Sequence, residues 1–298
     1  MLQAPPYLKP GDKVAITAPA SKLEATAVEI AVNILKERWG LQVVVGETIG
    51  ASYHDFAGSD AQRASELQRF LEDDSVNLIL AARGGYGVSK ILDSLSFEHF
   101  SPKWICGFSD LTALLLHINS LGFQAIHGVM AKTMAFDEPS NESLKNLLFG
   151  GKVDYVFTHN SEYFIEGKAE GEAIGGNLCL LANSVGSKSD ISFDGKILFL
   201  EDISEYLYSI DRMLVQLGRA EKLAKLAGLV VGDFSDCKEN DEPFGKNFQE
   251  IILEHISKYS YPVAFGFEFG HENRNFAIRM GETLSLDVNK FESKLKSI

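Results

Sequence analysis

The sequence predicts an α/β fold, with an N-terminal doubly wound (Rossmann-like) parallel sheet and a second, mixed domain. In residues 1–145, short apolar runs alternate with stretches of helical periodicity. This alternation is typical of a parallel sheet with helices on both faces. In residues 168–298, short strands with Gly and Asp turns dominate instead. A polar stretch rich in turn-forming residues separates the two, so we expect a connector over 146–167.

The N-terminal domain is expected to contain five strands, each a short apolar run: Lys13–Ala18, Leu41–Val45, Asn77–Ala82, Trp104–Gly107 and Gln124–His127. Apolar residues at helical spacing predict the helices between them: Leu23–Trp39, a helix opening at Gly58–Asp60, Val88–Leu95 and Leu111–Leu121. Folds of this kind bind ligands in loops at the carboxyl ends of the strands. The loops Arg83–Gly87 and Gly107–Asp110 both follow such strand ends.

The second domain is expected to mix strands and helices. Its expected strands are Lys168–Ile174, Lys196–Glu201, Gly228–Gly232, Pro262–Gly266, Asn275–Met280 and Thr283–Val288. Its expected helices lie at about Leu178–Ser184, Ser209–Leu217 and Lys246–Tyr259. The stretch Phe136–Phe164 before them is polar and interrupted by proline, asparagine and glycine, so we expect it to be irregular.

Composition limits the classes of partner. The chain has 298 residues, 45% of them hydrophobic, and 41 acidic against 28 basic residues give a net charge of −13. This acidic balance argues against nucleic acid and anionic membrane surfaces as partners. No run approaches the roughly 20 apolar residues of a membrane helix, and the opening residues do not have the pattern of a signal peptide.

The cysteines and histidines suggest a reduced compartment and no metal. Cys106, Cys179 and Cys237 cannot all pair within the chain, and none lies in a CxxC. Reduced thiols in a cytoplasmic protein are the simplest account. No Cys/His cluster has metal-ligand spacing, and we expect neither a metal nor another cofactor.

Ser109 occupies a turn between a strand and a helix. The apolar run Trp104–Gly107 ends just before it, and an apolar helical pattern begins at Leu111. On such a turn a serine hydroxyl points away from both elements, beside backbone N–H groups at the helix start. This is the layout of a nucleophile next to an oxyanion site. The alternative is that Ser109 only caps the helix, as serine often does.

The loop Arg83–Gly87 has three glycines in four positions, which let a backbone turn sharply and approach a ligand closely. A dinucleotide fingerprint would need a different spacing after the first strand, so nucleotide binding is disfavoured. The loop lies next to the Ser109 turn if the third and fourth strands are adjacent. It is then either a source of N–H groups for an oxyanion or a plain tight turn.

A carboxylate and a histidine complete the candidate set. Glu201 ends an apolar strand, where a carboxylate is fixed and partly desolvated and can orient a histidine; Asp202 and Glu205 compete with it. His271 follows an apolar run ending in glycine and heads a polar loop, so it is the candidate base that a serine needs. His127, at a strand end, is the runner-up. The others lie in helical patterns or in polar loops without a partner motif: His117, His255, His54, His99 and His159.

Several short motifs together resemble one protein family. They are Leu8–Asp12 with Ala18–Ser21, Arg83–Gly87, Gly107–Asp110, Gly175–Leu178, Leu200–Asp202 with Ile210–Leu214, and Phe269–His271. The set is similar to the LD-carboxypeptidase family of serine peptidases, which includes muramoyltetrapeptide carboxypeptidases and microcin-immunity peptidases. The resemblance runs nearly end to end, from about Leu8 to Val288.

The resemblance implies a Ser-Glu-His triad in that chain order, formed by Ser109, Glu201 and His271. It also implies that the backbone N–H groups of Asp110 and Gly85 hold the oxyanion. In the family's fold an N-terminal α/β domain carries the serine, and a C-terminal domain of a small β-barrel type carries the other two residues. Family members often form homodimers.

The substrate that the resemblance implies is a murein tetrapeptide, cut at the L,D-bond that joins L-Lys or diaminopimelate to the terminal D-Ala. A cytoplasmic location fits cell-wall recycling. A carboxypeptidase must also bind a free carboxylate, and four arginines are candidates by charge: Arg83, Arg212, Arg274 and Arg279. The chain departs from the family at position 279, where arginine replaces the proline of a common Pro-x-Gly turn.

Two alternatives stay open at this stage. The same chemistry could act on another acyl substrate, such as the peptidyl-nucleotide antibiotics of the microcin-immunity branch, although the sequence offers no assignable pocket for an aromatic base. A different class is a non-catalytic protein that binds a small molecule on a doubly wound scaffold, because a fold does not determine function.

Overall fold

The computed structural model of the chain describes residues 2–159 and 163–298; residues 160–162, part of the predicted connector, lie outside the described residues. The chain divides into two compact units. The N-terminal unit comprises Leu2–Gly151 and Phe276–Arg279, and the C-terminal unit comprises Lys152–Asn275 and Met280–Ile298. The chain therefore returns to its first unit for a few residues late in the sequence.

The N-terminal unit contains a sheet whose six described strands run in the order β11-β5-β4-β3-β1-β2. Strand β1 pairs in parallel with β2 and β3, and the parallel pairing continues through β4 to β5. The strands are β1 (Lys13–Thr17), β2 (Gln42–Val45), β3 (Val76–Ala81), β4 (Trp104–Gly107), β5 (Ala125–His127) and β11 (Ile278–Met280). Strands β1, β3 and β4 are almost wholly buried, as expected for a parallel sheet covered on both faces.

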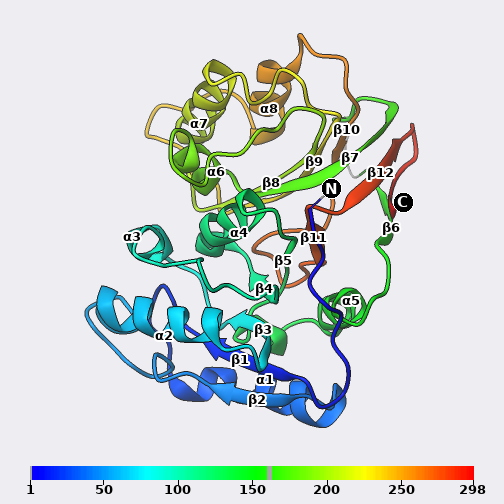
Figure 1. The fold of residues 1–298 in the computed structure, drawn as a ribbon. Helices are drawn as coiled ribbons and strands as arrows, with labels where there is room; N and C mark the ends of the chain where they lie inside the picture. Colours follow the sequence, from blue (N-terminus) through cyan, green and yellow to red (C-terminus); the bar gives the residue numbers. More distant parts are fainter. Residues whose placement is uncertain (1, 160–162) are drawn as a thin grey trace. The chain divides into compact units, whose positions relative to one another are not determined.

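Helices of the N-terminal unit cover both faces of this sheet. They are η1 (Ala25–Val28), α1 (Glu29–Asn33), η2 (Ile34–Arg38), α2 (Asp60–Glu72), α3 (Val88–Leu92), η3 (Ser109–Leu111), α4 (Thr112–Ser120), η4 (Thr133–Ala135) and α5 (Glu138–Leu148). The connection from β1 to β2 and the connection from β2 to β3 move across the sheet in opposite directions. Right-handed crossovers therefore place α1 and α2 on opposite faces, which Figure 1 shows.

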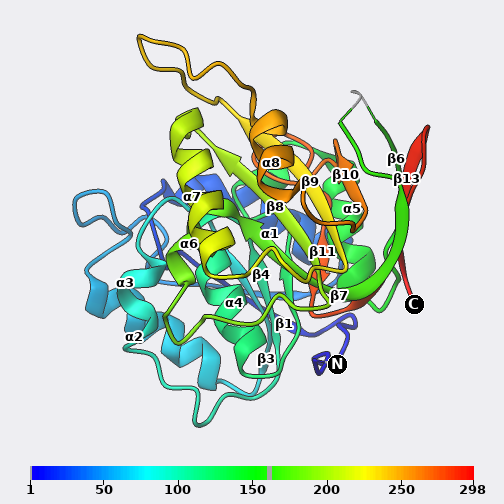
Figure 2. The ribbon, with the colours of Figure 1, turned by 90° about the horizontal axis from the view of Figure 1, so that it is seen from above.

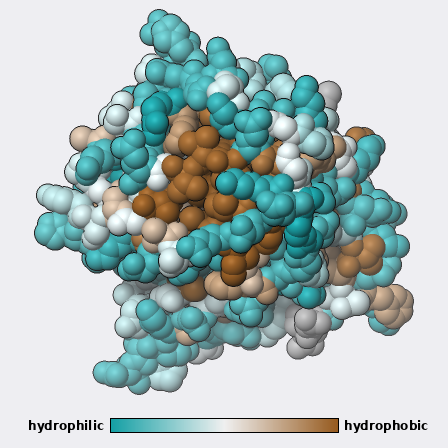
Figure 3. All heavy atoms as spheres, turned by 90° about the horizontal axis from the view of Figure 1, so that it is seen from below, coloured by the Kyte–Doolittle hydropathy of each residue, from teal (hydrophilic) through white to brown (hydrophobic). Residues whose placement is uncertain are grey.

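Strand β2 is an edge strand, and its side chains are partly exposed. Val44 and Val45 are exposed, as is Ile30 on the neighbouring helix α1. A groove of about 380 Å³ beside them is lined mainly by apolar residues, including Val32 and Ile49. Apolar side chains gather on the face that Figure 3 shows. An uncharged edge strand next to an apolar patch is a typical association surface.

The C-terminal unit contains a mixed sheet, whose seven described strands run in the order β10-β9-β8-β7-β12-β13-β6. Strands β7 to β10 pair in parallel, and β7, β12, β13 and β6 pair antiparallel. The strands are β6 (Asp154–Thr158), β7 (Gly167–Asn177), β8 (Ile197–Ile203), β9 (Gly228–Ser235), β10 (Val263–Phe265), β12 (Thr283–Val288) and β13 (Glu292–Ser297). Three helices pack beside β8 and β9 (Figure 2): α6 (Leu178–Ser184), α7 (Leu207–Arg219) and α8 (Phe248–Ile256).

The predicted fold class, an α/β protein with a parallel first sheet and a mixed second sheet, is confirmed. The prediction that 136–164 is irregular is wrong, because this stretch contains α5 and β6. The proline and the asparagine that suggested a break lie near the start of α5 instead. The Asp137 side chain accepts a hydrogen bond from the Ser140 N–H, and Pro139 stands in the first turn, where proline is tolerated.

Two further segments differ from expectation. Strand β13 was not predicted, because its charged residues hide the alternation that buries Ser293 and Leu295 completely. Strand β11 lies within the predicted strand 275–280, and it joins the sheet of the N-terminal unit next to β5. No helix in residues 2–159 or 163–298 is long and apolar enough to cross a membrane.

Candidate active site

Ser109 lies in the N-terminal unit, at the carboxyl end of β4 and the start of η3. Its φ of +62° places it in the left-handed region, which is costly for a residue with a Cβ. The residue before η3 is Phe108 and the residue before α4 is Leu111, so Ser109 does not cap either helix. A strained serine between a strand and a helix is typical of a nucleophile turn.

The glycine-rich loop after β3 packs against this serine. A Cβ placed on Gly84 would lie 2.9 Å from Cβ and 3.0 Å from Oγ of Ser109. Gly85 has a φ of +105°, and a Cβ there would lie 2.2 Å from Oγ of Ser21. The Ser21 N–H donates to the Gly84 carbonyl at 3.3 Å, and its Oγ accepts from the Tyr86 N–H at 3.2 Å. Only glycine fits at these two positions.

Replacement of Gly84 by alanine is expected to lower kcat at least 100-fold, because the new methyl group displaces Ser109. We also expect a loss of about 1–3 kcal/mol in the free energy of unfolding from overpacking. Gly218→Ala is the control, because a Cβ at this helical position meets nothing within 4 Å. Hydrolysis assays and urea unfolding measure both effects, and a fully active Gly84→Ala protein would contradict the contact.

Asp110 follows the serine and is 1% exposed. Its Oδ2 accepts a hydrogen bond from the Val88 N–H at 2.8 Å. Burial raises the pKa of Asp110 to about 6, although the Val88 hydrogen bond and the charge of Arg63 oppose the rise. The carboxylate therefore ties the turn of Ser109 to the start of α3, which follows the glycine loop.

Glu201 and His271 lie in the C-terminal unit and contact each other directly. Nδ1 of His271 and Oε2 of Glu201 are 2.7 Å apart, and the two side chains are 13% and 0% exposed. Burial lowers the pKa of His271, but the hydrogen bond and charge of Glu201 outweigh this, so the pKa lies above its ordinary value of 6.5. A buried carboxylate that orients an imidazole is the arrangement of a general base.

Local backbone features explain why these two side chains meet. The pairing of β8 with β9 shifts register between Leu200 and Asp202, so Glu201 lies at an irregularity of the kind that redirects side chains. Gly270 precedes His271 with a φ of +139°, and a Cβ there would lie 3.1 Å from Cβ of Glu201. A larger residue at 270 would therefore push the histidine loop away from the carboxylate.

The competing candidates have other contacts. Asp202 accepts hydrogen bonds from the Asn177 side chain at 2.8 Å and from the Cys179 N–H at 3.0 Å, which fixes the start of α6. His127 is fully buried in the N-terminal unit, with its ring 5.7 Å from that of Phe108. His255 pairs with an aspartate between α7 and α8, which agrees with a structural role.

The four candidate arginines differ in their surroundings. Arg279 is 3% exposed, and its guanidinium contacts the Tyr7 hydroxyl at 3.4 Å and the Gly151 carbonyl. Arg279 thus holds β11 against Gly151, the last residue of the first segment of the N-terminal unit. Arg83 donates to the Lys22 carbonyl at 2.9 Å. The guanidinium of Arg212 lies over the Tyr208 ring, and Arg274 pairs with Glu268.

A pocket of about 280 Å³ in the C-terminal unit includes Asp233 and Glu272, the residue after His271. Oδ2 of Asp233 is buried and accepts no hydrogen bond from the described residues, whereas Glu272 accepts one from the Ser235 hydroxyl at 2.5 Å. Burial raises the pKa of Asp233 to about 7, and the carboxylates of Glu272 and Glu201 add to the rise. This side chain was not predicted from the sequence, which shows no feature that singles it out.

Replacement of Asp233 by asparagine is expected to change the pH dependence of stability. A carboxyl group whose pKa is raised from 3.8 to about 7 stabilises the folded state below pH 4, and this contribution is lost as pH rises through about 7. The free energy of unfolding of Asp233→Asn, relative to that of wild type, should therefore increase by about 1 kcal/mol between pH 5 and pH 8, after allowing for solvent screening. Urea unfolding at several pH values measures this difference, and replacement of the exposed Asp236 by asparagine is the control. If the stability of wild type and of Asp233→Asn changed with pH in the same way, the expectation would be wrong.

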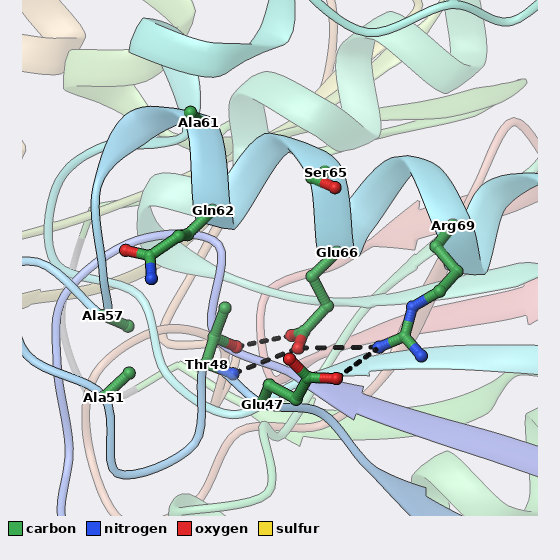
Figure 4. Close-up of a pocket in the computed structure, with 9 residues that line it drawn as sticks. All are labelled: Glu47, Thr48, Ala51, Ala57, Ala61, Gln62, Ser65, Glu66 and Arg69. Carbon is green, nitrogen blue, oxygen red and sulfur yellow. Dashed lines mark hydrogen bonds and ion pairs between the residues drawn. The ribbon is translucent and has the colours of Figure 1, made fainter.

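A pocket of about 450 Å³ lies at the outer part of the N-terminal unit, between α2 and the loop after β2 (Figure 4). The buried carboxylate of Glu66 accepts hydrogen bonds from the hydroxyls of Thr17 and Thr48, both at 2.6 Å. Figure 4 shows Arg69 pointing toward Glu66 and Glu47, and its ion-pair distances to both are 3.9 Å. None of the predicted site residues lines this pocket, whose polar contacts hold β1 and the loop after β2 to α2.

In the part of the chain that the structure describes, no three His, Cys, Asp or Glu side chains are grouped as ligands of a metal ion. The N-terminal unit holds a serine at positive φ on a strand-to-helix turn. The C-terminal unit, described by itself, holds an imidazole paired with a buried carboxylate. A serine on such a turn and an imidazole beside a buried carboxylate are the kinds of group that hydrolases with nucleophilic catalysis use.

Comparisons with known proteins specify the family. Residues 14–128 match the model of the LD-carboxypeptidase N-terminal domain, and residues 170–286 match that of the LD-carboxypeptidase C-terminal domain. The chain belongs to the LD-carboxypeptidase family, as the sequence motifs predicted, and it is a peptidase.

Relatives match the chain over nearly its whole length. A probable murein peptide carboxypeptidase of Bacillus subtilis is 33% identical over 294 residues, which cover 95% of this chain and 91% of that protein. A murein tetrapeptide carboxypeptidase of Pseudomonas aeruginosa is 28% identical, with 93% and 94% covered.

Solved structures agree with the fold. A muramoyltetrapeptide carboxypeptidase from Oxalobacter formigenes is 27% identical and superposes with a TM-score of 0.84, covering 96% of this chain and 98% of that one. An MccF-like protein from Bacillus anthracis superposes with a TM-score of 0.85 over 99% of both chains. At 22% identity it shows the shared fold alone.

Proposed function

We propose that the protein is a serine-type LD-carboxypeptidase that releases the terminal D-Ala from murein tetrapeptides. The observation that carries the proposal is the 2.7 Å contact between His271 and the buried Glu201, because an imidazole held in this way can act as a general base. The strained turn of Ser109 supplies a nucleophile. The names of the Bacillus and Pseudomonas relatives support murein peptides as the substrate class.

The reaction would proceed through an acyl-enzyme. Nε2 of His271 takes the proton of the Ser109 hydroxyl as Oγ attacks the carbonyl carbon of the scissile bond. Glu201 accepts the hydrogen bond from Nδ1, which selects the tautomer and stabilises the imidazolium. His271 then protonates the leaving amine of D-Ala, and a water molecule activated by the same histidine hydrolyses the ester.

Backbone N–H groups would stabilise the oxyanion that forms at each step. The candidates are those of Asp110, at the start of η3, and of Gly85, in the loop that packs near Ser109. Each such donor is worth about 2.7–4 kcal/mol in related chemistry. Proton transfer further requires Oγ of Ser109 and Nε2 of His271 to come within about 3 Å in the reactive state.

The test is release of D-Ala from synthetic murein tri-, tetra- and pentapeptides. We expect hydrolysis of the tetrapeptide at its L,D-bond, and little release of L-Ala from the matching tetrapeptide that ends in L-Ala. A peptidyl-nucleotide substrate in the same assay examines the microcin-immunity alternative. A protein that binds the tetrapeptide without cleaving it would instead favour the non-catalytic alternative.

Two finer statements belong to the same proposal. The protein would act in the cytoplasm on recycled cell-wall peptides, and it would form a homodimer. The exposed edge of β2, with Val44 and Val45, supports association, because the outer edge of this strand offers backbone groups for pairing with another chain. Sedimentation velocity measures the oligomeric state, and cell fractionation measures the location.

A further inference from the structure

Arg63 is a fully buried arginine on α2, and its side chain is 0% exposed. Four of the five N–H groups that a guanidinium carries are accounted for. Nε donates to the Gly58 carbonyl at 3.3 Å, and Nη1 donates to the carbonyls of Pro19 and Gly87 at 2.5 and 3.0 Å. Nη2 pairs with the Asp60 carboxylate. The arginine therefore binds mainly backbone carbonyl groups, not acidic side chains.

The carbonyls of Pro19 and Gly87 belong to two different loops at one edge of the sheet. Pro19 follows β1 and Gly87 follows β3, and these strands are parallel neighbours. The same loops are joined a second time through Ser21, which contacts the Gly84 carbonyl and the Tyr86 N–H. Arg63 and Ser21 thus fasten the glycine loop to the loop after β1 at two separate points.

The fastened loop is the one that borders the candidate nucleophile. Gly84 packs against that serine, and the carboxylate of Asp110 accepts hydrogen bonds from the N–H groups of Gly87 and Val88. The backbone at Gly87 is therefore held on its carbonyl side by Arg63 and on its N–H side by Asp110. A Cβ at Gly87 would lie 2.7 Å from Nη1 of Arg63, so the guanidinium also packs closely against the backbone of Gly87.

Stability alone is a weak reason for an arginine here. Position 63 lies on the apolar face of α2 with Leu67 and Phe70, where an aliphatic side chain would be buried at lower cost. The ion pair with Asp60 offers limited compensation, because that carboxylate is half exposed. What only arginine supplies is a planar set of donors that reaches several carbonyls at once, which lysine cannot reproduce.

We propose that Arg63 is a positioning residue of the hydrolysis: it clamps the loop after β1 to the glycine loop and so holds the oxyanion-binding N–H groups in place. The inference rests on the proposed function. Loss of the clamp should lower kcat much more than it changes KM, because the affected N–H groups act on the charge that forms in the transition state. A displacement of about 1 Å is sufficient for a loss of about 100-fold.

The experiment compares Arg63→Lys with two controls on the same helix. Leu67→Val also disturbs the buried face of α2 but removes no hydrogen bond to either loop, so it measures the effect of lower stability alone. Arg69→Ala removes an arginine of the same helix that points into the pocket of Figure 4. We measure kcat and KM for D-Ala release below the unfolding transition of each protein. Amide hydrogen exchange of residues 84–88 measures how often the backbone of the glycine loop opens, independently of any activity assay.

We expect Arg63→Lys to lower kcat about 100-fold with KM within about threefold of wild type, and to speed exchange in the glycine loop at least tenfold. Both controls should keep kcat within about twofold. In Arg63→Ala, added methylguanidinium should restore part of kcat, whereas methylammonium should not. A normal kcat and normal exchange in Arg63→Lys, or a loss equal to that of Leu67→Val, would overturn the inference. If wild type releases no D-Ala, the proposed function itself is wrong.

Discussion

Replacement of Ser109 by alanine or glycine is expected to abolish hydrolysis, with a loss of at least about 10⁴-fold in kcat. In the proposed mechanism this hydroxyl forms the acyl-enzyme, and neither alanine nor glycine supplies a nucleophile in its place. The two variants should differ in stability, because Ser109 has a φ of +62°. Glycine tolerates this conformation and alanine does not, so Ser109→Gly should be more stable than Ser109→Ala by about 1 kcal/mol.

D-Ala release and urea unfolding measure the two effects separately. Ser120→Ala is the matched control, since it removes a serine hydroxyl from the other end of α4, where the hydroxyl donates to the His117 carbonyl at 2.7 Å. That control should retain kcat within about twofold. Residual activity above about 1% in Ser109→Ala would exclude Ser109 as the nucleophile. A glycine variant less stable than the alanine variant would contradict strain at the turn.

Replacement of Glu201 by glutamine is expected to lower kcat about 10³–10⁴-fold, because the imidazole loses the group that selects its tautomer and stabilises its charge. The pKa of His271 should also fall, since burial still lowers it and the hydrogen bond and charge of Glu201, the largest influences that raise it, are gone. The base must be neutral to accept a proton. The acid limb of the kcat/KM profile should therefore lie above pH 6.5 in wild type and move to lower pH in Glu201→Gln.

Replacement of His271 by alanine is expected to destabilise the C-terminal unit as well as stop catalysis. Glu201 is 0% exposed, and removal of its partner leaves a buried carboxylate without a counter-charge. Breaking a buried pair in this way costs about 3–5 kcal/mol. The double variant Glu201→Gln, His271→Ala should recover most of this loss.

A second pair in the same unit provides the control. His255 and Asp211 are 2.8 Å apart, but their side chains are 18% and 36% exposed. His255→Ala should therefore cost at most about 1 kcal/mol, as exposed pairs do. If His255→Ala and His271→Ala lowered the free energy of unfolding by the same amount, burial of the Glu201–His271 pair would not explain the expected difference.

The parts of the site that depend on short stretches of chain could be predicted from the sequence. The turn of Ser109 follows from an apolar run that ends at Gly107 and an apolar helical pattern that begins at Leu111. Glu201 became a candidate because it follows four apolar residues, although β8 continues beyond it to Ile203. Helix α5 was missed for the opposite reason, since Pro139 can either break a helix or begin one, and the local pattern does not distinguish the two.

Arg63 was missed, although a signal was present. It lies four residues before Leu67, on the face of α2 that the apolar pattern marks as buried. A charged side chain at a position that periodicity assigns to the core needs hydrogen-bond acceptors, because burying it without them is costly. The sequence pattern does not show which residues elsewhere in the chain provide them. Its acceptors, Pro19 and Gly87, are 44 residues before it and 24 residues after it.

By itself the sequence determined the α/β class, the strand ends that carry chemistry and the family, because periodicity and turn residues act over a few positions. The tertiary structure decided which carboxylate meets the imidazole, since Glu201 and its neighbour Asp202 are alike in sequence. It also decided which side chains hold the glycine loop. These choices depend on strand register and on contacts between residues far apart in the chain, where a shift of one position redirects a side chain.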